Sequence, residues 1–109
     1  MGKVYVFDLD HTLCDVKFIN NKRWDYQNAT PYQDRIEAVN KLYDQGHEII
    51  IETARGSVSG KNWMSITKNQ LSTWGLKYHK LRTGVKFPAD FYIDDKAIND
   101  KEFFNELFN

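Results

Sequence analysis

Short β-branched and aromatic segments that end abruptly in acidic or hydroxyl side chains constrain this chain most. Between these segments lie stretches in which apolar residues recur at helical spacing. Such alternation of strand and helix patterns is typical of a parallel α/β sheet. In each segment the polar residues come directly after the apolar run: Asp8 and Asp10 after residues 3–7, Thr53 after residues 47–52, and Asp94 and Asp95 after residues 91–93. Such runs are expected as buried strands.

The remaining elements follow from periodicity and from turn residues. A helix is expected to begin at Thr30-Pro31, with Thr30 as its cap, and to end at Gln45-Gly46. Further elements are predicted as a helix over residues 63–74, a short strand over 77–81 and a terminal helix over 100–108. The fold prediction is an α/β protein with a three-layer, Rossmann-like parallel sheet of about four to five strands.

Length and charge narrow the classes of partner. The 109 residues predict a single domain over residues 1–109, with a small flap at residues 14–30. The 15 basic residues balance the 15 acidic ones, so neither nucleic acid nor a membrane surface is expected as a partner. A lone cysteine and the lack of a recognisable signal peptide predict a cytoplasmic protein.

The polar residues at the strand ends suggest phosphoryl chemistry. Ligands of parallel sheets bind at the carboxyl ends of the strands, where these side chains meet. The Asp8 carboxylate can attack phosphorus if Mg²⁺, shared with Asp94, neutralises the phosphoryl oxygens. Lys86 adds a positive charge and Thr53 a hydroxyl donor, while Asp10 can act as acid and then as base.

Each of these features is weak alone. Acidic residues often follow strands in loops, a strand-final Thr is commonly only a β-former, and a loop Lys is usually solvated. Their occurrence together, on successive strand ends, is what favours a functional site.

With these motifs in view, the sequence resembles the haloacid dehalogenase superfamily, chiefly its phosphatases. The resemblance covers residues 4–98 and rests on VFDLDHTL (6–13), IET (51–53), Lys86 and YIDD (92–95). Three longer segments resemble a subgroup associated with capsule and lipopolysaccharide biosynthesis: GHEIIIETARG (46–56), QLSTWGLKYHKL (70–81) and PADFYIDDKA (88–97).

The resemblance implies a phosphoric monoester hydrolase. Asp8 would be the nucleophile and form a phospho-aspartate, and Asp10 would be the acid and base. The side chains of Asp8 and Asp94 and the backbone carbonyl of Asp10 would bind Mg²⁺. The substrate would be a small phosphorylated metabolite, such as a phosphorylated sugar used in surface polysaccharide synthesis.

Supporting roles follow from the same resemblance. Thr12 would stabilise the tight loop, and Asp95 would support the metal ligands or orient Lys86. Phe87 separates Lys86 from Pro88, unlike the usual pattern, so Lys80 is the alternative for the motif lysine. His11 stands where relatives commonly carry Gly, and His tolerates the left-handed conformation better than most residues.

The chain offers no room for a cap domain, so a capless phosphatase core is expected, with an oligomer supplying the cover that keeps water out. Arg55 and Lys61, in the loop after Thr53, are candidates for substrate contacts at the mouth of the site. Two other classes stay open: a phospho-accepting receiver domain and a non-catalytic binding domain. The order of the motifs, with the D-x-D pair first, favours the phosphatase over a receiver.

Overall fold

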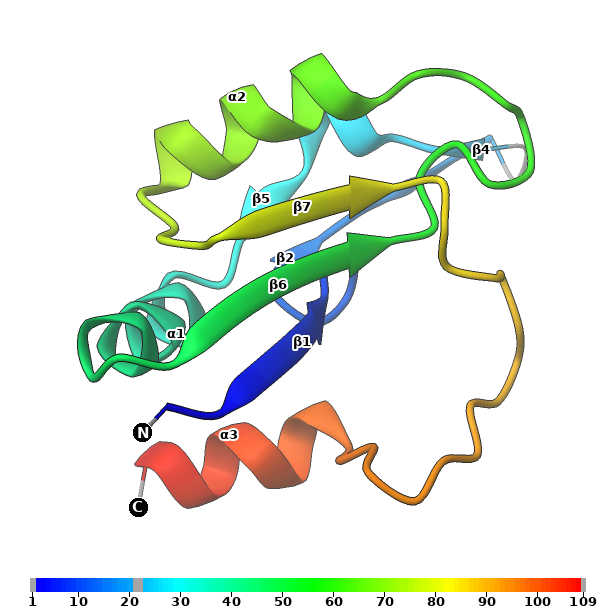
Figure 1. The fold of residues 1–109 in the computed structure, drawn as a ribbon. Helices are drawn as coiled ribbons and strands as arrows, with labels where there is room; N and C mark the ends of the chain where they lie inside the picture. The colour runs from blue at the N-terminus through cyan, green and yellow to red at the C-terminus, as the bar shows by residue number, and fades with distance from the viewer. Residues whose placement is uncertain (1, 21–22, 109) are drawn as a thin grey trace.

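A three-stranded parallel sheet forms the centre of the protein. The computed structural model describes residues 2–20 and 23–108. Strands β1 (Val4–Asp8), β6 (Glu48–Thr53) and β7 (Lys80–Thr83) lie in the order β1-β6-β7 and are all parallel (Figure 1). Their carboxyl ends therefore lie at the same end of the sheet, which confirms the predicted α/β class and strand direction.

The sheet is smaller than the sequence predicted. Residues 91–93 form no strand, and the sheet has three strands rather than four or five. Phe91 and Ile93 are 83% and 98% exposed, so no neighbouring layer covers the apolar side chains that suggested a buried strand. Instead, the chain between β7 and α3 passes outside the sheet as an extended connection (Figure 1).

All three helices pack on one face of the sheet. They are α1 (Gln33–Asp44), α2 (Met64–Trp74) and α3 (Asp100–Phe108). One continuous apolar core joins the helices to this face of the sheet, and its members include Phe7, Ile36, Ile49, Ile51, Leu71 and Phe104. On the other face Val4 and Val6 are largely exposed, so the described residues form two layers and not three.

The helices obey the apolar spacing read from the sequence. In α1 a buried stripe runs through Ile36, Val39 and Leu42, and α2 ends at Gly75 in the left-handed conformation, with φ of 74°. The start of α1 differs from the prediction, because the helix begins at Gln33 and Thr30 does not cap it. Thr30 belongs instead to strand β5.

The segment expected as a flap is built from short antiparallel pairs. Strand β2 (Cys14–Asp15) pairs with β5 (Thr30–Pro31), and β3 (Phe18–Ile19) pairs with β4 (Arg23–Trp24). A 3₁₀ turn, η1 (Tyr26–Asn28), joins β4 to β5. Within the described ranges, no helix combines the length and apolar character needed to cross a bilayer.

Candidate active site

The tight loop after β1 holds the D-x-D pair. Leu9 and Leu13 are fully buried and anchor the loop in the core, and the backbone N–H of Leu13 donates to the Leu9 carbonyl at 2.8 Å. His11 adopts φ of 66°, as its tolerance of the left-handed region predicted. The loop thus turns sharply without a glycine.

Asp8 lies at the end of β1 beside a cation and a hydroxyl. Lys86 Nζ is 3.3 Å from Asp8 Oδ1, and Thr12 Oγ1 donates to Asp8 Oδ2 at 3.4 Å. Burial raises the pKa of Asp8 above its ordinary value, and the Lys86 charge and hydrogen bond oppose that rise. Asp8 is therefore a partly desolvated carboxylate facing a positive charge, which suits a nucleophile for an anionic group.

Asp10 is held by Thr53, the last residue of β6, and by Arg55, which follows that strand. Arg55 Nη2 and Nε donate to Asp10 Oδ1 at 2.8 and 3.1 Å, and Nε also lies 3.1 Å from Asp10 Oδ2. Thr53 Oγ1 donates to Asp10 Oδ2 at 3.3 Å. The predicted pairing of the first and second strand ends is thus present, with Thr53 contacting Asp10.

Arg55 requires a correction. It was predicted as a substrate contact at the mouth, but its side chain is fully buried. Besides Asp10, its Nη1 donates to Thr67 Oγ1 at 3.1 Å and to Gln70 Oε1 at 2.6 Å, and its guanidinium lies 4.9 Å from the Tyr26 ring centre. Its donors are occupied within the protein, so it orients Asp10 and does not reach outward.

Thr67 and Gln70 are the residues that sequence reasoning missed. Both lie in the helix predicted over residues 63–74, but neither was named as a site residue. The signal was the pair of polar residues three apart on α2, facing the loop that carries Arg55. Gln70 also donates to the Tyr26 carbonyl at 2.6 Å, which ties the flap to the same network.

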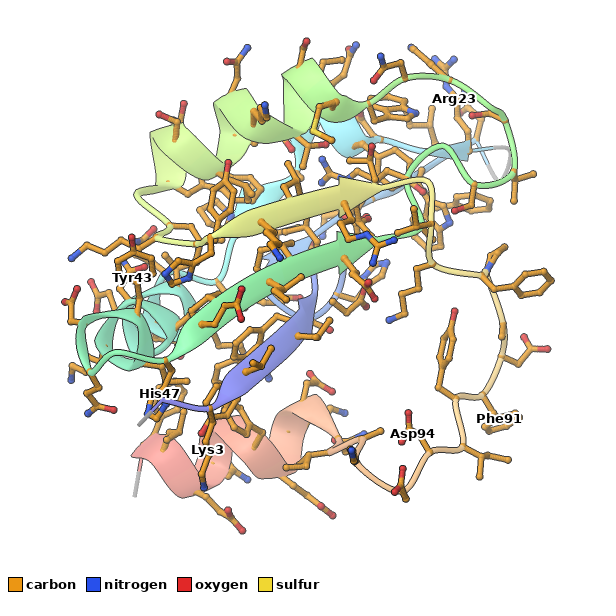
Figure 2. The ribbon with its side chains drawn as sticks, viewed as in Figure 1. Lys3, Arg23, Tyr43, His47, Phe91 and Asp94 are labelled. Atoms are coloured by element: carbon orange, nitrogen blue, oxygen red, sulfur yellow. The ribbon has the colours of Figure 1, made fainter. Side chains whose placement is uncertain are left out.

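Asp94 lines the same cavity as Asp8, but it lies in a loop and not at the end of a strand as predicted. Both carboxylates line a cavity of about 810 Å³, together with Thr12 and Lys86. Figure 2 shows Asp94 on the connection between β7 and α3 rather than at the end of a strand. A hydrogen bond from the backbone N–H of Lys96 holds the pKa of Asp94 below its ordinary value, and a side-chain hydrogen bond with Asp95 lowers it further.

A divalent ion is compatible with this donor set. Among residues 2–20 and 23–108, no three His, Cys, Asp or Glu side chains gather closely enough to form a full metal cage. Mg²⁺ does not need one, because it commonly takes one or two carboxylates and completes its shell with water and phosphate oxygens. Asp8 and Asp94 are the two carboxylates of the predicted metal-binding set that line this cavity.

Of the other predicted residues, Lys86 contacts Asp8, whereas Lys80, Lys61 and Asp95 have other surroundings. Lys86, not Lys80, contacts Asp8, whereas Lys80 lies on β7 with its Nζ 3.8 Å from Glu48. Lys61 is exposed, with its Nζ 4.4 Å from the Trp63 ring centre. Asp95 is also exposed and forms a side-chain hydrogen bond with Asp94, while Lys86 pairs with Asp8.

Comparison with known proteins identifies the family of this chain. A family model described as polynucleotide kinase 3 phosphatase matches residues 3–103, which spans every residue of the site. This chain belongs to the polynucleotide kinase 3 phosphatase family. A search of curated proteins gave no match.

A solved structure supports the fold. The crystal structure of a structural-genomics target from Vibrio cholerae is 29% identical to this chain, with a TM-score of 0.77, over 99% of this chain and 94% of that one. The polynucleotide kinase 3 phosphatase family has a haloacid dehalogenase-like phosphatase fold, so the resemblance read from the motifs is confirmed at that level. Membership of the capsule-associated subgroup is not part of that confirmation.

Proposed function

We propose that this polynucleotide kinase 3 phosphatase family member is a Mg²⁺-dependent phosphomonoester hydrolase that works through a phospho-aspartate at Asp8. The observation that carries the proposal is the contact of Asp8 with Lys86, next to an Asp10 held by Arg55 and Thr53. Two-step phosphoryl transfer needs a nucleophilic carboxylate beside a cation and a second, oriented carboxyl group that carries protons.

In the first step an Asp8 oxygen attacks phosphorus and the bond from phosphorus to the ester oxygen breaks. Asp10 gives its proton to the departing oxygen. Asp10 then takes a proton from water, the water oxygen attacks the phosphoryl group, and inorganic phosphate leaves with the Asp8 carboxylate restored. Lys86 stabilises the negative charge on the phosphoryl oxygens throughout.

Mg²⁺, held by Asp8, Asp94 and the backbone carbonyl of Asp10, would supply further charge neutralisation for the phosphoryl oxygens. The cavity shared by Asp8 and Asp94 supports this assignment. We further propose a small phosphorylated metabolite as substrate, such as a phosphorylated sugar in surface polysaccharide synthesis, and a cytoplasmic location. A second subunit would cover the capless site.

A panel of phosphomonoesters tests the function. Phosphate release from sugar phosphates is expected with Mg²⁺, to stop when EDTA removes the ion and to return when Mg²⁺ is restored. A receiver domain would take up one phosphoryl group per chain and stop. Stoichiometric labelling without turnover, or no reaction with any ester, would overturn the proposal.

The family match favours a second candidate substrate, the 3′-phosphate of a nucleic acid, because that reaction is what the family's description implies. The balance of 15 basic and 15 acidic residues is its weakness, since nucleic-acid binding normally draws on an excess of positive charge. A 3′-phosphorylated oligonucleotide belongs in the same panel. If its kcat/KM exceeds that of every small ester about tenfold or more, this candidate replaces the first.

Lys86 and Lys80 provide a matched pair of variants. Lys86→Met is expected to lower kcat by about 10²-fold or more, because it removes the charge 3.3 Å from Asp8. Lys80→Met, which removes an exposed cation from β7, should leave kcat within about twofold. Steady-state kinetics on one substrate compares the two. Equal losses in both variants would contradict the assignment of Lys86.

A further inference from the structure

A second hollow lies between the flap and the loop that follows β6. Its volume is about 660 Å³, within the usual range for small-molecule sites. We call it the flap hollow, and the aromatic side chains that line it are Phe18, Trp24, Tyr26 and Trp63. Phe18 and Trp24 are 46% and 43% exposed, so packing within the flap leaves much of their surface free to contact a ligand.

The flap hollow adjoins the catalytic groups. The Trp24 ring lies 4.9 Å from the ring of His11, the residue that follows Asp10. Tyr26 packs against the Arg55 guanidinium that orients Asp10. Ala54, which follows Thr53, lines the hollow as well. A group esterified to a phosphate at Asp8 can therefore extend toward this hollow on the side where Asp10 delivers its proton.

Two cations line the flap hollow. The first is Lys61, which lies over the Trp63 ring. The second is Arg23 on the flap, and Figure 2 shows it at the end of the molecule where the flap meets the loop after β6. The lining also includes the carboxylate of Asp25, which accepts a hydrogen bond from Asn28 at 2.8 Å. Aromatic faces with cations beside them favour a flat ring and a negative charge in one ligand.

We propose that the flap hollow binds the leaving group of the substrate, and that this leaving group carries a flat unsaturated ring with a negatively charged substituent. This inference rests on the proposed phosphatase function, and within the phosphomonoesters it favours esters with a flat ring over simple sugar phosphates. The aromatic walls select the ring by stacking, and Lys61 and Arg23 select the charge.

Two esters that differ only in ring flatness test the aromatic part. Benzyl phosphate and cyclohexylmethyl phosphate both release a primary alcohol of similar size. We expect kcat/KM to be about fivefold or more higher for the benzyl ester. Trp24→Leu should remove most of this preference, whereas Phe108→Leu, which replaces a similarly exposed aromatic on α3, should retain it. Equal kcat/KM for the two esters in the wild type would overturn the proposal.

A carboxylate on the ring tests the charge. We expect 4-carboxybenzyl phosphate to have a KM about threefold or more below that of benzyl phosphate, and Lys61→Gln to abolish the difference. If the carboxylate raises KM or leaves it unchanged in the wild type, the assigned ligand charge is wrong.

The experiments distinguish failure of the proposed ligand for the flap hollow from failure of the phosphatase proposal. Equal hydrolysis of the benzyl and cyclohexylmethyl esters would overturn the hollow alone. If neither these esters nor any ester of the panel above is hydrolysed with Mg²⁺, the phosphatase proposal fails, and binding of benzylphosphonate is then followed by NMR. Shifts of the Trp24 and Trp63 indole signals would support the hollow, and unchanged indole signals would overturn it.

Discussion

Asp8→Asn is expected to abolish phosphate release, with kcat falling by a factor on the order of 10⁴ or more. An amide has nearly the same size as the carboxylate but cannot form the acyl phosphate. The hydrogen bond from Thr12 and the position near Lys86 can persist, so the loss should be chemical and not structural. Steady-state phosphate release measures the loss, and thermal unfolding checks that the variant is folded.

A matched control is Asp44→Asn. Asp44 makes an exposed ion pair with Lys77 at the end of α1, away from the site. Its substitution should therefore leave kcat unchanged. Rapid quenching of the wild type during turnover should trap an acid-stable, hydroxylamine-sensitive phosphoryl group that Asp8→Asn lacks. Turnover by Asp8→Asn near the wild-type rate would rule out Asp8 as the nucleophile.

Arg55→Met is expected to destabilise the protein and to inactivate it at the same time. The substitution leaves the Asp10 carboxylate without its cation and removes the donors to Thr67 and Gln70. Removing one partner of a buried ion pair typically costs about 3–5 kcal/mol of unfolding free energy. In a domain of this size each kcal/mol lowers Tm by about 4–8 °C. Urea unfolding gives the free energy, and kcat reports the loss of Asp10 orientation.

Two further variants separate the contributions. Arg55→Lys keeps the charge but loses the two-pronged contact, so part of the stability should return while kcat stays low. Arg55→Met with Asp10→Asn removes the unpaired charge, and the double variant should be more stable than Arg55→Met alone. If Arg55→Met unfolds at the same urea concentration as the wild type, the buried network does not stabilise the fold as described.

The sequence was informative wherever a local pattern decides the structure. Residues 3–7 and 47–52 are apolar runs that end in Asp8 and Thr53, and both became parallel strands with those residues at their carboxyl ends. The left-handed His11 was also predictable, because the constraint on φ belongs to one residue. Contacts between these strand ends followed from the direction of the strands alone.

Long-range partners were harder to predict. The burial of Arg55 depends on where α2 places Thr67 and Gln70, and no local pattern encodes that distance. Residues 91–93 have the composition of a strand, but strand formation depends on tertiary pairing, and within residues 2–20 and 23–108 the only strand paired with β1 is β6. The cap predicted at Thr30 failed for the same reason, since pairing with Asp15 draws Thr30 into a strand.

The Arg55 side chain has a consequence for the motion of the flap. One guanidinium contacts Asp10, α2 through Thr67 and Gln70, and the ring of Tyr26. The Gln70 amide closes this circuit by donating to the Tyr26 carbonyl. A displacement of η1 away from α2 would break that hydrogen bond and uncover the guanidinium, so the same contacts that hold the flap also hold Asp10 in its orientation.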